Sequence, residues 1–302
     1  MRLDAFQSEL PRAFAGNLNA PHPLDRRFRA LVQDVPGMAT ESKLALLNLA
    51  AAHLDPGEAY LEVGSFKGLS LIGAMLGNGH ARFYAIENFL EFNLDASATR
   101  AELLGNLARW VDPRQVGLLE GDCFRLLRRD LLLEAPVGVY FYDGAHGRLP
   151  HYLALGVAER WLADRALVVI DDASWPMVAQ ATERYLRRHP GYELLFDLAA
   201  EREEDPRWWN GLRVYAFRRE AAGREAAGRE AAGRRAAGGA PAHRAGAQGW
   251  PGLELAWRYL AYDIAYQPAM RLAWRTLPRH PRLASAALKL VPMSSRRVPE
   301  CG

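Results

Sequence analysis

The sequence predicts a doubly wound α/β fold, in which a mostly parallel sheet is covered by helices on both faces. Through the middle of the chain, short runs of β-forming residues alternate with helical patterns. Several runs are apolar nearly throughout, which is typical of parallel strands buried on both faces. The predicted strands are residues 59–63, 82–87, 115–120, 137–143, 166–172, 192–198 and 211–217.

The flanking segments also follow from local patterns. A helix is expected before the first strand, because Thr40 or Ser42 supplies a start signal for the helical apolar spacing of TESKLALLNLAAAHL. The last two strands lie close together in sequence, which suits an antiparallel hairpin at the edge of the sheet. We therefore expect an N-terminal helical segment over residues 1–37 and the main domain over residues 38–218.

The remaining chain is of a different kind. REAAG repeats in tandem after Arg218, and because each repeat carries a glycine and the period does not match a helical turn, residues 219–251 are predicted to be a linker. Residues 252–302 return to apolar residues at helical spacing, broken at Pro268, with an arginine-rich polar face. This basic helical tail is expected to dock on the main domain or to form a homo-oligomer contact. A membrane-surface or partner-binding element is the alternative.

Composition narrows the function classes. No run reaches the roughly 18 apolar residues of a membrane span, and the first residues lack a signal-peptide pattern, so we expect a cytoplasmic protein. The net charge of +3 conceals an asymmetry: residues 1–218 carry 24 Lys and Arg against 29 Asp and Glu, and residues 219–302 carry 14 against 6. The acidic main domain argues against nucleic-acid binding. The two cysteines form no disulfide framework.

A nucleoside-binding pattern follows the first predicted strand. In EVGSFKGLS, Gly64 allows a tight turn at the strand end, and Gly68 allows backbone and helix to approach a ligand closely. Glu87 ends the next strand, where a carboxylate can accept hydrogen bonds from ribose hydroxyls. The glycine spacing is not the GxGxxG of dinucleotide binding, which favours a nucleoside without a pyrophosphate. A close turn with an incidental glutamate is the competing interpretation.

Asp122 follows the third predicted strand, at the edge of the sheet where an adenine would lie. An acidic group there can accept a hydrogen bond from the adenine amino group. An Asx turn after the strand explains the same residue equally well.

Five motifs in a fixed order now give a specific resemblance. EVGSFKGLS, AIENF, EGD, YFYDGAH and VVIDD resemble the motifs of class I S-adenosylmethionine (SAM) dependent methyltransferases, in the branch of macrocin O-methyltransferase, cephalosporin-cluster methyltransferase-like proteins and, more distantly, catechol O-methyltransferase. The resemblance implies a Rossmann-like seven-stranded sheet with an antiparallel last strand, and SAM as cofactor. The cofactor-binding residues that we expect are Glu62, Gly64, Ser65, Gly68, Ser70, Glu87, Asp122 and Asp143.

Three carboxylates end the fourth and fifth predicted strands: Asp143, Asp171 and Asp172. Neighbouring parallel strands bring such groups together, and their mutual repulsion calls for a positive partner. Hard oxygen ligands suit Mg²⁺, and the catechol-type resemblance supports a divalent ion at these positions. The alternative is that Asp143 contacts the SAM amino group, while Asp171 and Asp172 serve as a helix N-cap and a solvent-facing acid.

His146 is the candidate base, because it follows Asp143 by three residues, where the catechol-type pattern places a lysine. Histidine titrates near neutral pH and can remove a proton from an acceptor hydroxyl. The alternative is that His146 is an ordinary surface loop residue, and the nearby His151 makes the assignment of a base less specific.

The expected function is O-methyl transfer from SAM to a small hydroxylated metabolite or sugar, assisted by a divalent metal, with His146 and Asp143 as catalytic residues. The alternatives are a metal-independent N- or C-methyltransferase, and a non-catalytic SAM-binding module that works through its C-terminal helices. Residues 219–302 are expected to be dispensable for SAM binding, because the predicted sheet is complete at Phe217. The identity of the acceptor is not encoded in any motif.

Overall fold

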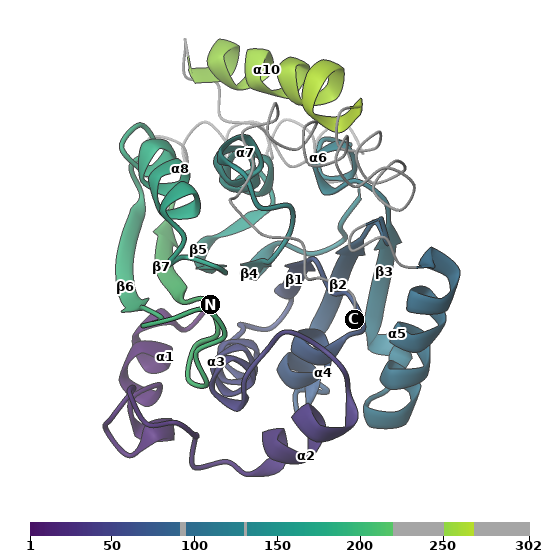
Figure 1. The fold of residues 1–302 in the computed structure, drawn as a ribbon. Helices are drawn as coiled ribbons and strands as arrows, with labels where there is room; N and C mark the ends of the chain where they lie inside the picture. Colours follow the sequence, from purple (N-terminus) through teal and green to yellow (C-terminus); the bar gives the residue numbers. More distant parts are fainter. Residues whose placement is uncertain (91–94, 130–131, 220–250, 269–302) are drawn as a thin grey trace, which may run out of the picture.

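The computed structural model describes residues 1–90, 95–129, 132–219 and 251–268. Its centre is a seven-stranded sheet with the order β3-β2-β1-β4-β5-β7-β6 (Figure 1). β7 runs antiparallel to both β5 and β6, and the other neighbouring pairs are parallel. The strands are β1 Ala59–Val63, β2 Arg82–Glu87, β3 Val116–Glu120, β4 Val137–Tyr142, β5 Leu162–Ile170, β6 Tyr192–Leu198 and β7 Leu212–Arg218.

The predicted fold is confirmed, including the antiparallel edge. The bounds of β1, β2 and β6 agree with the sequence-based ranges, whereas β5 begins at Leu162 instead of residue 166. The added residues include Asp164 and Arg165, which are polar and interrupt the apolar run. Arg165 pairs with the end of the antiparallel β7, where a polar side chain reaches solvent, so β5 continues past its buried part.

Helices cover both faces of the sheet (Figure 1). One face carries α1 Leu3–Glu9, α2 Arg27–Asp34, α3 Glu41–Ala52, α4 Leu69–Met75 and α5 Ala96–Trp110. The other face carries α6 Cys123–Leu126, α7 Arg148–Ala158, α8 Pro176–Leu186 and α10 Pro251–Ala261, which continues into a π-helix over Tyr262–Tyr266. Two short 3₁₀ helices, Arg12–Phe14 and Pro113–Gln115, complete the described elements.

The strands divide the core into two clusters by the alternation of their side chains. Within β4, Val139 and Phe141 pack toward α3 and α4, and Tyr140 and Tyr142 pack toward α6 and α7. The N-terminal helices share the first cluster, where Phe14 packs against Trp208 with ring centroids 5.4 Å apart. Residues 1–37 therefore complete the core that the sheet begins.

α3 begins as the sequence predicts. Thr40 is the N-cap, and its hydroxyl accepts a hydrogen bond from the Lys43 amide at 3.1 Å. Ser42 lies inside the helix and is buried. The helix is apolar on most of its surface because it lies between the sheet and the helices α2 and α4. Lys43 is buried within it, which the apolar pattern does not explain.

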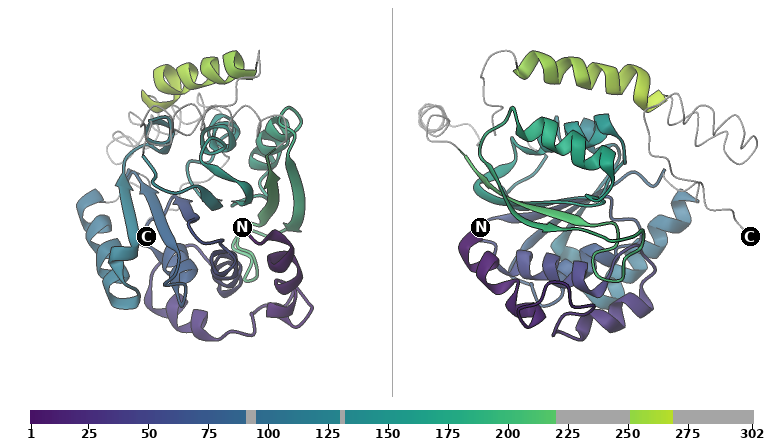
Figure 2. Two further views of the ribbon diagram at one scale, coloured as in Figure 1. Left: turned by 180° about the vertical axis from the view of Figure 1, so that it is seen from behind. Right: turned by 60° about the vertical axis from the view of Figure 1, so that its left-hand side comes forward.

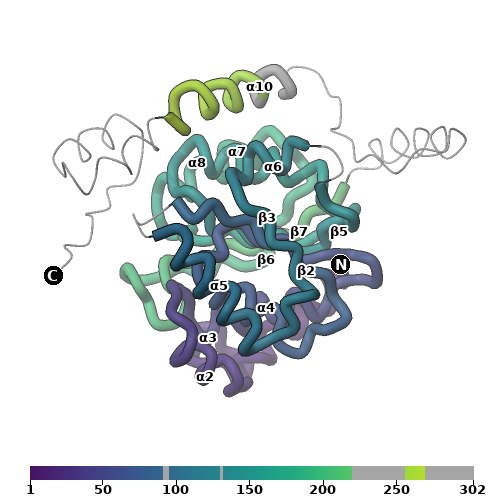
Figure 3. Tube along the Cα trace, turned by 90° about the vertical axis from the view of Figure 1, so that its right-hand side faces the viewer, coloured from purple at the N-terminus to yellow at the C-terminus, as the bar shows by residue number. Residues whose placement is uncertain are grey.

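α10 forms a further layer outside α6, α7 and α8, on the face opposite α3 and α4 (Figure 2). The same arrangement is visible along the perpendicular direction (Figure 3). Of the two amphipathic helices expected in the tail, the first is this helix, and the second lies outside the described residues. No helix in the described ranges combines the length and the apolar character that crossing a membrane requires.

Candidate active site

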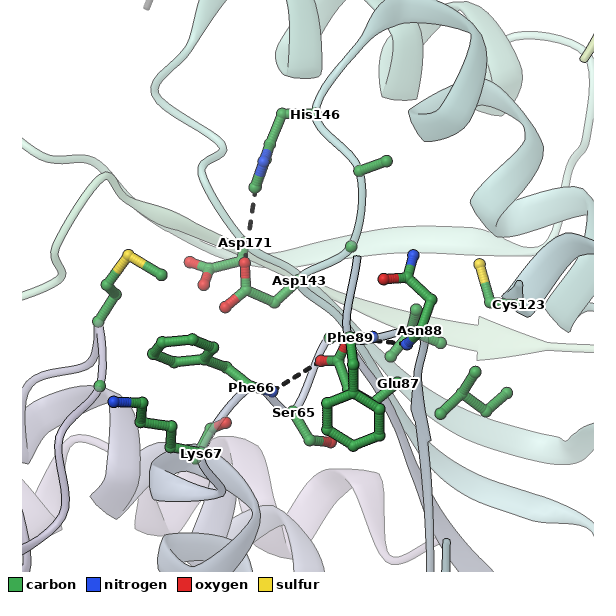
Figure 4. Close-up of a pocket in the computed structure, with 18 of the residues that line it drawn as sticks. Ser65, Phe66, Lys67, Glu87, Asn88, Phe89, Cys123, Asp143, His146 and Asp171 are labelled. Atoms are coloured by element: carbon green, nitrogen blue, oxygen red, sulfur yellow. Dashed lines mark hydrogen bonds and ion pairs between the residues drawn. The ribbon is translucent and has the colours of Figure 1, made fainter. Parts of the chain in front are cut away.

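A pocket opens at the carboxyl ends of β1, β2, β4 and β5, which is where doubly wound sheets bind ligands. In Figure 4, Glu87, Asn88 and Phe89 lie in one part of it, and His146 and Asp171 lie in another. Nine of the eleven predicted site residues line the pocket: Gly64, Ser65, Ser70, Glu87, Asp122, Asp143, His146, Asp171 and Asp172. Glu62 and Gly68 are not among its lining residues.

The two glycines of the β1–α4 turn have different roles. Gly64 has a φ of +89°, and a Cβ atom there would lie 1.9 Å from the Asp143 carbonyl oxygen. Because Gly64 has no Cβ atom, the ends of β1 and β4 can meet under the pocket. Gly68 has a φ of +93°, and a Cβ there would lie 2.7 Å from Leu103 of α5. The lack of a side chain at Gly68 therefore allows the start of α4 to pack against α5, whereas the sequence predicted a close approach to a ligand.

Glu87 organises the loops above β1 and β2. Its Oε2 accepts a hydrogen bond from the Phe66 amide at 2.7 Å, and its Oε1 accepts from the amides of Asn88 at 2.7 Å and Phe89 at 2.9 Å. An ionised carboxylate offers about four acceptor positions, so these bonds still leave room for a ribose hydroxyl. The carboxylate is thus held at the place expected for it.

Backbone strain is concentrated at this pocket. Six non-glycine residues in the described ranges have positive φ angles, and four of them line the pocket: Phe66, Phe89, Asp172 and Trp209. Each such conformation costs of order 1–3 kcal/mol and persists only where the surrounding structure imposes it. The clustering marks the pocket as a functional site.

Glu62 lies beneath the pocket and is fully buried. Its carboxylate accepts hydrogen bonds from Tyr60 Oη and Ser70 Oγ, each at 2.9 Å. Burial raises its pKa to about 7, although these two hydroxyls oppose the shift. Glu62 therefore positions the start of α4, through Ser70.

The raised pKa of Glu62 predicts how the stability of the fold depends on pH. Because the folded pKa lies above the unfolded value of 4.5, Glu62 has no effect on stability below pH 4.5 and destabilises the fold increasingly up to about pH 7. The free energy of unfolding of Glu62→Gln is expected to exceed that of the wild type by up to about 3 kcal/mol at pH 8 and to equal it at pH 4. Urea denaturation at both pH values measures this. The exposed Glu102→Gln is the control, and an equal gain at both pH values would refute the cause.

Asp122 is the N-cap of α6, and its Oδ1 accepts from the Arg125 amide at 2.9 Å. The alternative that the sequence left open was an Asx turn after the strand, and this local side-chain bond to a backbone amide agrees with it. The same side chain also lines the pocket, so both interpretations describe it. Its Oδ2 is engaged by two residues of the C-terminal segment, Tyr262 and Gln267.

The carboxylates of the fourth and fifth strands meet as expected, and two side chains of the protein partly neutralise their charge. Lys43 Nζ lies 2.5 Å from Asp171 Oδ2, and both side chains are buried. His146 Nε2 forms an ion pair with Asp172 and lies 3.6 Å from Asp143 Oδ1. Asn210 donates a hydrogen bond to Asp172 Oδ1 at 2.7 Å.

The charges follow from these pairs. Burial alone would lower the pKa of Lys43, but the three aspartates raise it above its usual value. Burial would likewise lower the pKa of His146, and Asp172 and Asp143 raise it to about 10. Both side chains are therefore cations at neutral pH. Burial and Asp143 raise the pKa of Asp171 despite Lys43, whereas His146 holds the pKa of Asp172 low although burial opposes this.

The residues fit a divalent ion, but not in the predicted set. Asp143, His146 and Asp172 offer ligand atoms within 4.8 Å of one another. His146 Nε2 is buried and makes no well-directed hydrogen bond to either acid, which is consistent with a ligand role. Asp171 instead accepts from Lys43 with one oxygen and from the Asp172 amide with the other. Two carboxylates suit Mg²⁺ or Mn²⁺, and the imidazole favours Mn²⁺ of the two because nitrogen is a softer ligand than oxygen.

His151 and three tryptophans have different surroundings in the structure. His151 is buried behind His146, and burial lowers its pKa to about 3, so it is neutral and not a base for the pocket. Trp209 lines the pocket, whereas Trp208 is a core residue that donates to the Leu18 carbonyl. Trp175 packs edge-on against His146, with centroids 5.1 Å apart.

Sequence reasoning missed Lys43 and Tyr262. A signal for Lys43 existed, because it is the one charged residue within the apolar spacing that follows the start of α3. No local signal marks Tyr262, whose aromatic ring sits in an amphipathic segment of ordinary appearance. Its place in the pocket is a result of tertiary docking.

No protein-family model matches the chain, and no curated protein matches it. Solved structures are similar to it, among them the O-methyltransferase TomG from Streptomyces achromogenes in complex with SAM, which is 18% identical with a TM-score of 0.50 and is matched over 72% of this chain and 100% of that chain. A putative O-methyltransferase from Klebsiella pneumoniae is 16% identical, with a TM-score of 0.47 over 72% and 100%. The likeness to TomG shows the fold alone. The chain has the α/β Rossmann-like fold of the class I methyltransferases.

Proposed function

We propose that the protein is a SAM-dependent O-methyltransferase that acts on a small hydroxylated metabolite or sugar. The observation that supports this most strongly is the composition of one pocket. A part suited to a nucleoside, with Gly64, Glu87 and Asp122, opens directly onto an acid–histidine group, with Asp143 and His146. The resemblance of the motifs to the macrocin and catechol branch agrees with this arrangement.

The charges of the acid group suit a cationic cofactor. Asp143, Asp171 and Asp172 carry up to three negative charges, and Lys43 and His146 contribute two positive ones. The group is therefore left with a net negative charge of about one, beside the place proposed for SAM. When bound, SAM supplies an activated methyl group on a positively charged sulfur. Asp143 is available to accept a hydrogen bond from its amino group.

The chain's own residues would hold the acceptor and move its proton. Asp143 is the most exposed of the three acids, at 24% of its side chain against 2% for Asp171 and 4% for Asp172. An acceptor hydroxyl can therefore donate to Asp143, and its proton passes to the Asp143 carboxylate as the methyl group is transferred. His146, which was expected to be the base, is already protonated without a metal and instead stabilises this carboxylate by its charge. Trp209, which lines the same pocket, forms an apolar wall for the acceptor.

A divalent ion held by Asp143, His146 and Asp172 would lower the pKa of an acceptor hydroxyl bound to it. We include such an ion in the proposal. The second candidate is methyl transfer without a metal, and Lys43 is the observation that favours it, because this buried cation already neutralises Asp171.

Cofactor binding tests the proposed function directly. We expect calorimetry to show binding of SAM and S-adenosylhomocysteine, with Glu87→Ala weakening both by roughly 1.5–3 kcal/mol, the contribution of charged hydrogen bonds. The matched control is Glu120→Ala, because Glu120 lies opposite Glu87 in the sheet register but is exposed and paired with Arg100. Tight NAD binding without SAM binding would reject the assignment.

A further inference from the structure

The C-terminal segment is attached to the main domain by charged and aromatic contacts. Asp263 binds the guanidinium of Arg128 with both carboxylate oxygens, at 3.1 and 2.9 Å, and lies 3.4 Å from Arg125 Nε. The Arg128 guanidinium also stacks over the ring of Tyr259, 4.7 Å from its centroid. These contacts fix the end of α10 over α6 (Figure 1).

This docking brings Tyr262 into the cofactor pocket. Tyr262 is 3% exposed and lines the pocket, and its ring packs edge-on against Phe124 with centroids 4.6 Å apart. Its hydroxyl donates to Asp122 Oδ2 at 2.7 Å. Gln267 Nε2 donates to the same oxygen and lies 3.1 Å from the Tyr262 hydroxyl. Two residues of the tail therefore meet the acid expected beside adenine.

The hydrogen-bond capacity of Asp122 is then nearly filled. Its Oδ1 caps α6, and its Oδ2 receives both Tyr262 and Gln267, whereas a carboxylate oxygen accepts about two hydrogen bonds. An adenine amino group that reaches Asp122 Oδ2 must therefore take the place of the Gln267 amide. Gln267 Oε1 is buried and has no hydrogen-bond partner among the described residues. A donor such as the adenine amino group would satisfy this acceptor.

We propose that Tyr262 and Gln267 are recognition residues for the 6-aminopurine of the cofactor, so that the C-terminal segment forms the outer wall of the nucleoside site. Gln267 turns its amide oxygen to the purine amino group, and Tyr262 retains the hydrogen bond that holds Asp122. The inference rests on the proposed function. It also revises the expectation that residues 219–302 are dispensable for SAM binding.

The test uses the full chain and two ligands: S-adenosylhomocysteine and its analogue whose purine lacks the 6-amino group. We expect Gln267→Ala to weaken binding of S-adenosylhomocysteine about tenfold and to leave the analogue within about twofold. Tyr262→Phe keeps the ring and should weaken S-adenosylhomocysteine several-fold. Ile264→Ala is the matched control, because Ile264 lies in the same segment but is 67% exposed, and it should bind both ligands like the wild type.

The outcomes separate the inference from the function on which it rests. If the wild type binds neither ligand, the proposed function fails. If the wild type binds S-adenosylhomocysteine and both variants bind it equally well, the function stands and the inference is wrong. Equal losses for the two ligands would reject recognition of the amino group, and tighter binding by the variants would show that the segment excludes the nucleoside.

Discussion

Lys43→Met is expected to lower the free energy of unfolding by about 3–5 kcal/mol at pH 7, the usual cost of leaving one partner of a buried ion pair alone. Lys43 and Asp171 are 0% and 2% exposed, so water does not replace the lost partner. Methionine fills a similar volume, which keeps the loss of packing small. Urea denaturation of the full chain measures the change.

Two controls identify the cause. Lys67→Met removes a lysine on the rim of the same pocket, but its partner Glu102 is half exposed, so the expected change is at most about 1 kcal/mol. Adding Asp171→Asn to Lys43→Met removes the orphaned charge and should restore part of the stability. The deficit of Lys43→Met should also shrink as the pH falls, because protonation neutralises Asp171. A small deficit that does not vary with pH would contradict the buried ion pair.

The sequence was sufficient for the centre of the sheet because central strands such as β1 and β4 are buried on both faces. Continuous apolar runs such as RFYAIE leave little choice of structure, and β2 follows that run residue for residue. The polar start of β5 could not be predicted in this way, because it depends on pairing with strands that are distant in the sequence: Arg165 pairs with Arg218 of β7, and Leu162 pairs with Val137 of β4. Non-local pairing of this kind leaves no periodic signal in the local sequence.

The candidate site likewise contains residues that the sequence could predict and partners that it could not. Residues at strand ends, such as Glu87 and Asp143, were predictable because the topology of a parallel sheet brings strand ends to one edge. Their partners were not, because Lys43 reaches Asp171 across 128 residues and Tyr262 reaches Asp122 across 140. The predicted repulsion among three acids was a sound inference, but the sequence could not show that Lys43 and His146 supply the opposing charge.

Metal binding is the prediction with the largest expected effect on activity. We expect the full chain to bind one equivalent of Mn²⁺, seen by electron paramagnetic resonance, and Asp143→Asn and Asp172→Asn to abolish this binding, because each removes one of three ligands. Substitutions of Asp171 alone are unsuitable tests of the metal site, because loss of the Asp171 carboxylate leaves Lys43 as an unpaired buried charge. With a competent hydroxylated acceptor, EDTA should stop turnover, and Mn²⁺ or Mg²⁺ should restore it.

The ligand role of His146 adds a pH dependence that separates the two mechanisms. Because its pKa is raised to about 10 in the metal-free protein, an ion must displace a proton from His146, and Mn²⁺ affinity should rise with pH, by up to about tenfold per unit, between pH 6 and 9. His146→Gln should bind Mn²⁺ more weakly and lose this dependence, while S-adenosylhomocysteine binding changes little. Asp143→Asn should lower turnover by about 10²–10⁴-fold, since the acceptor then lacks both the carboxylate and the ion. Full turnover in EDTA, with no Mn²⁺ bound at pH 8, would instead assign the neutralising charge to Lys43 and protonated His146, and methyl transfer would proceed without a metal.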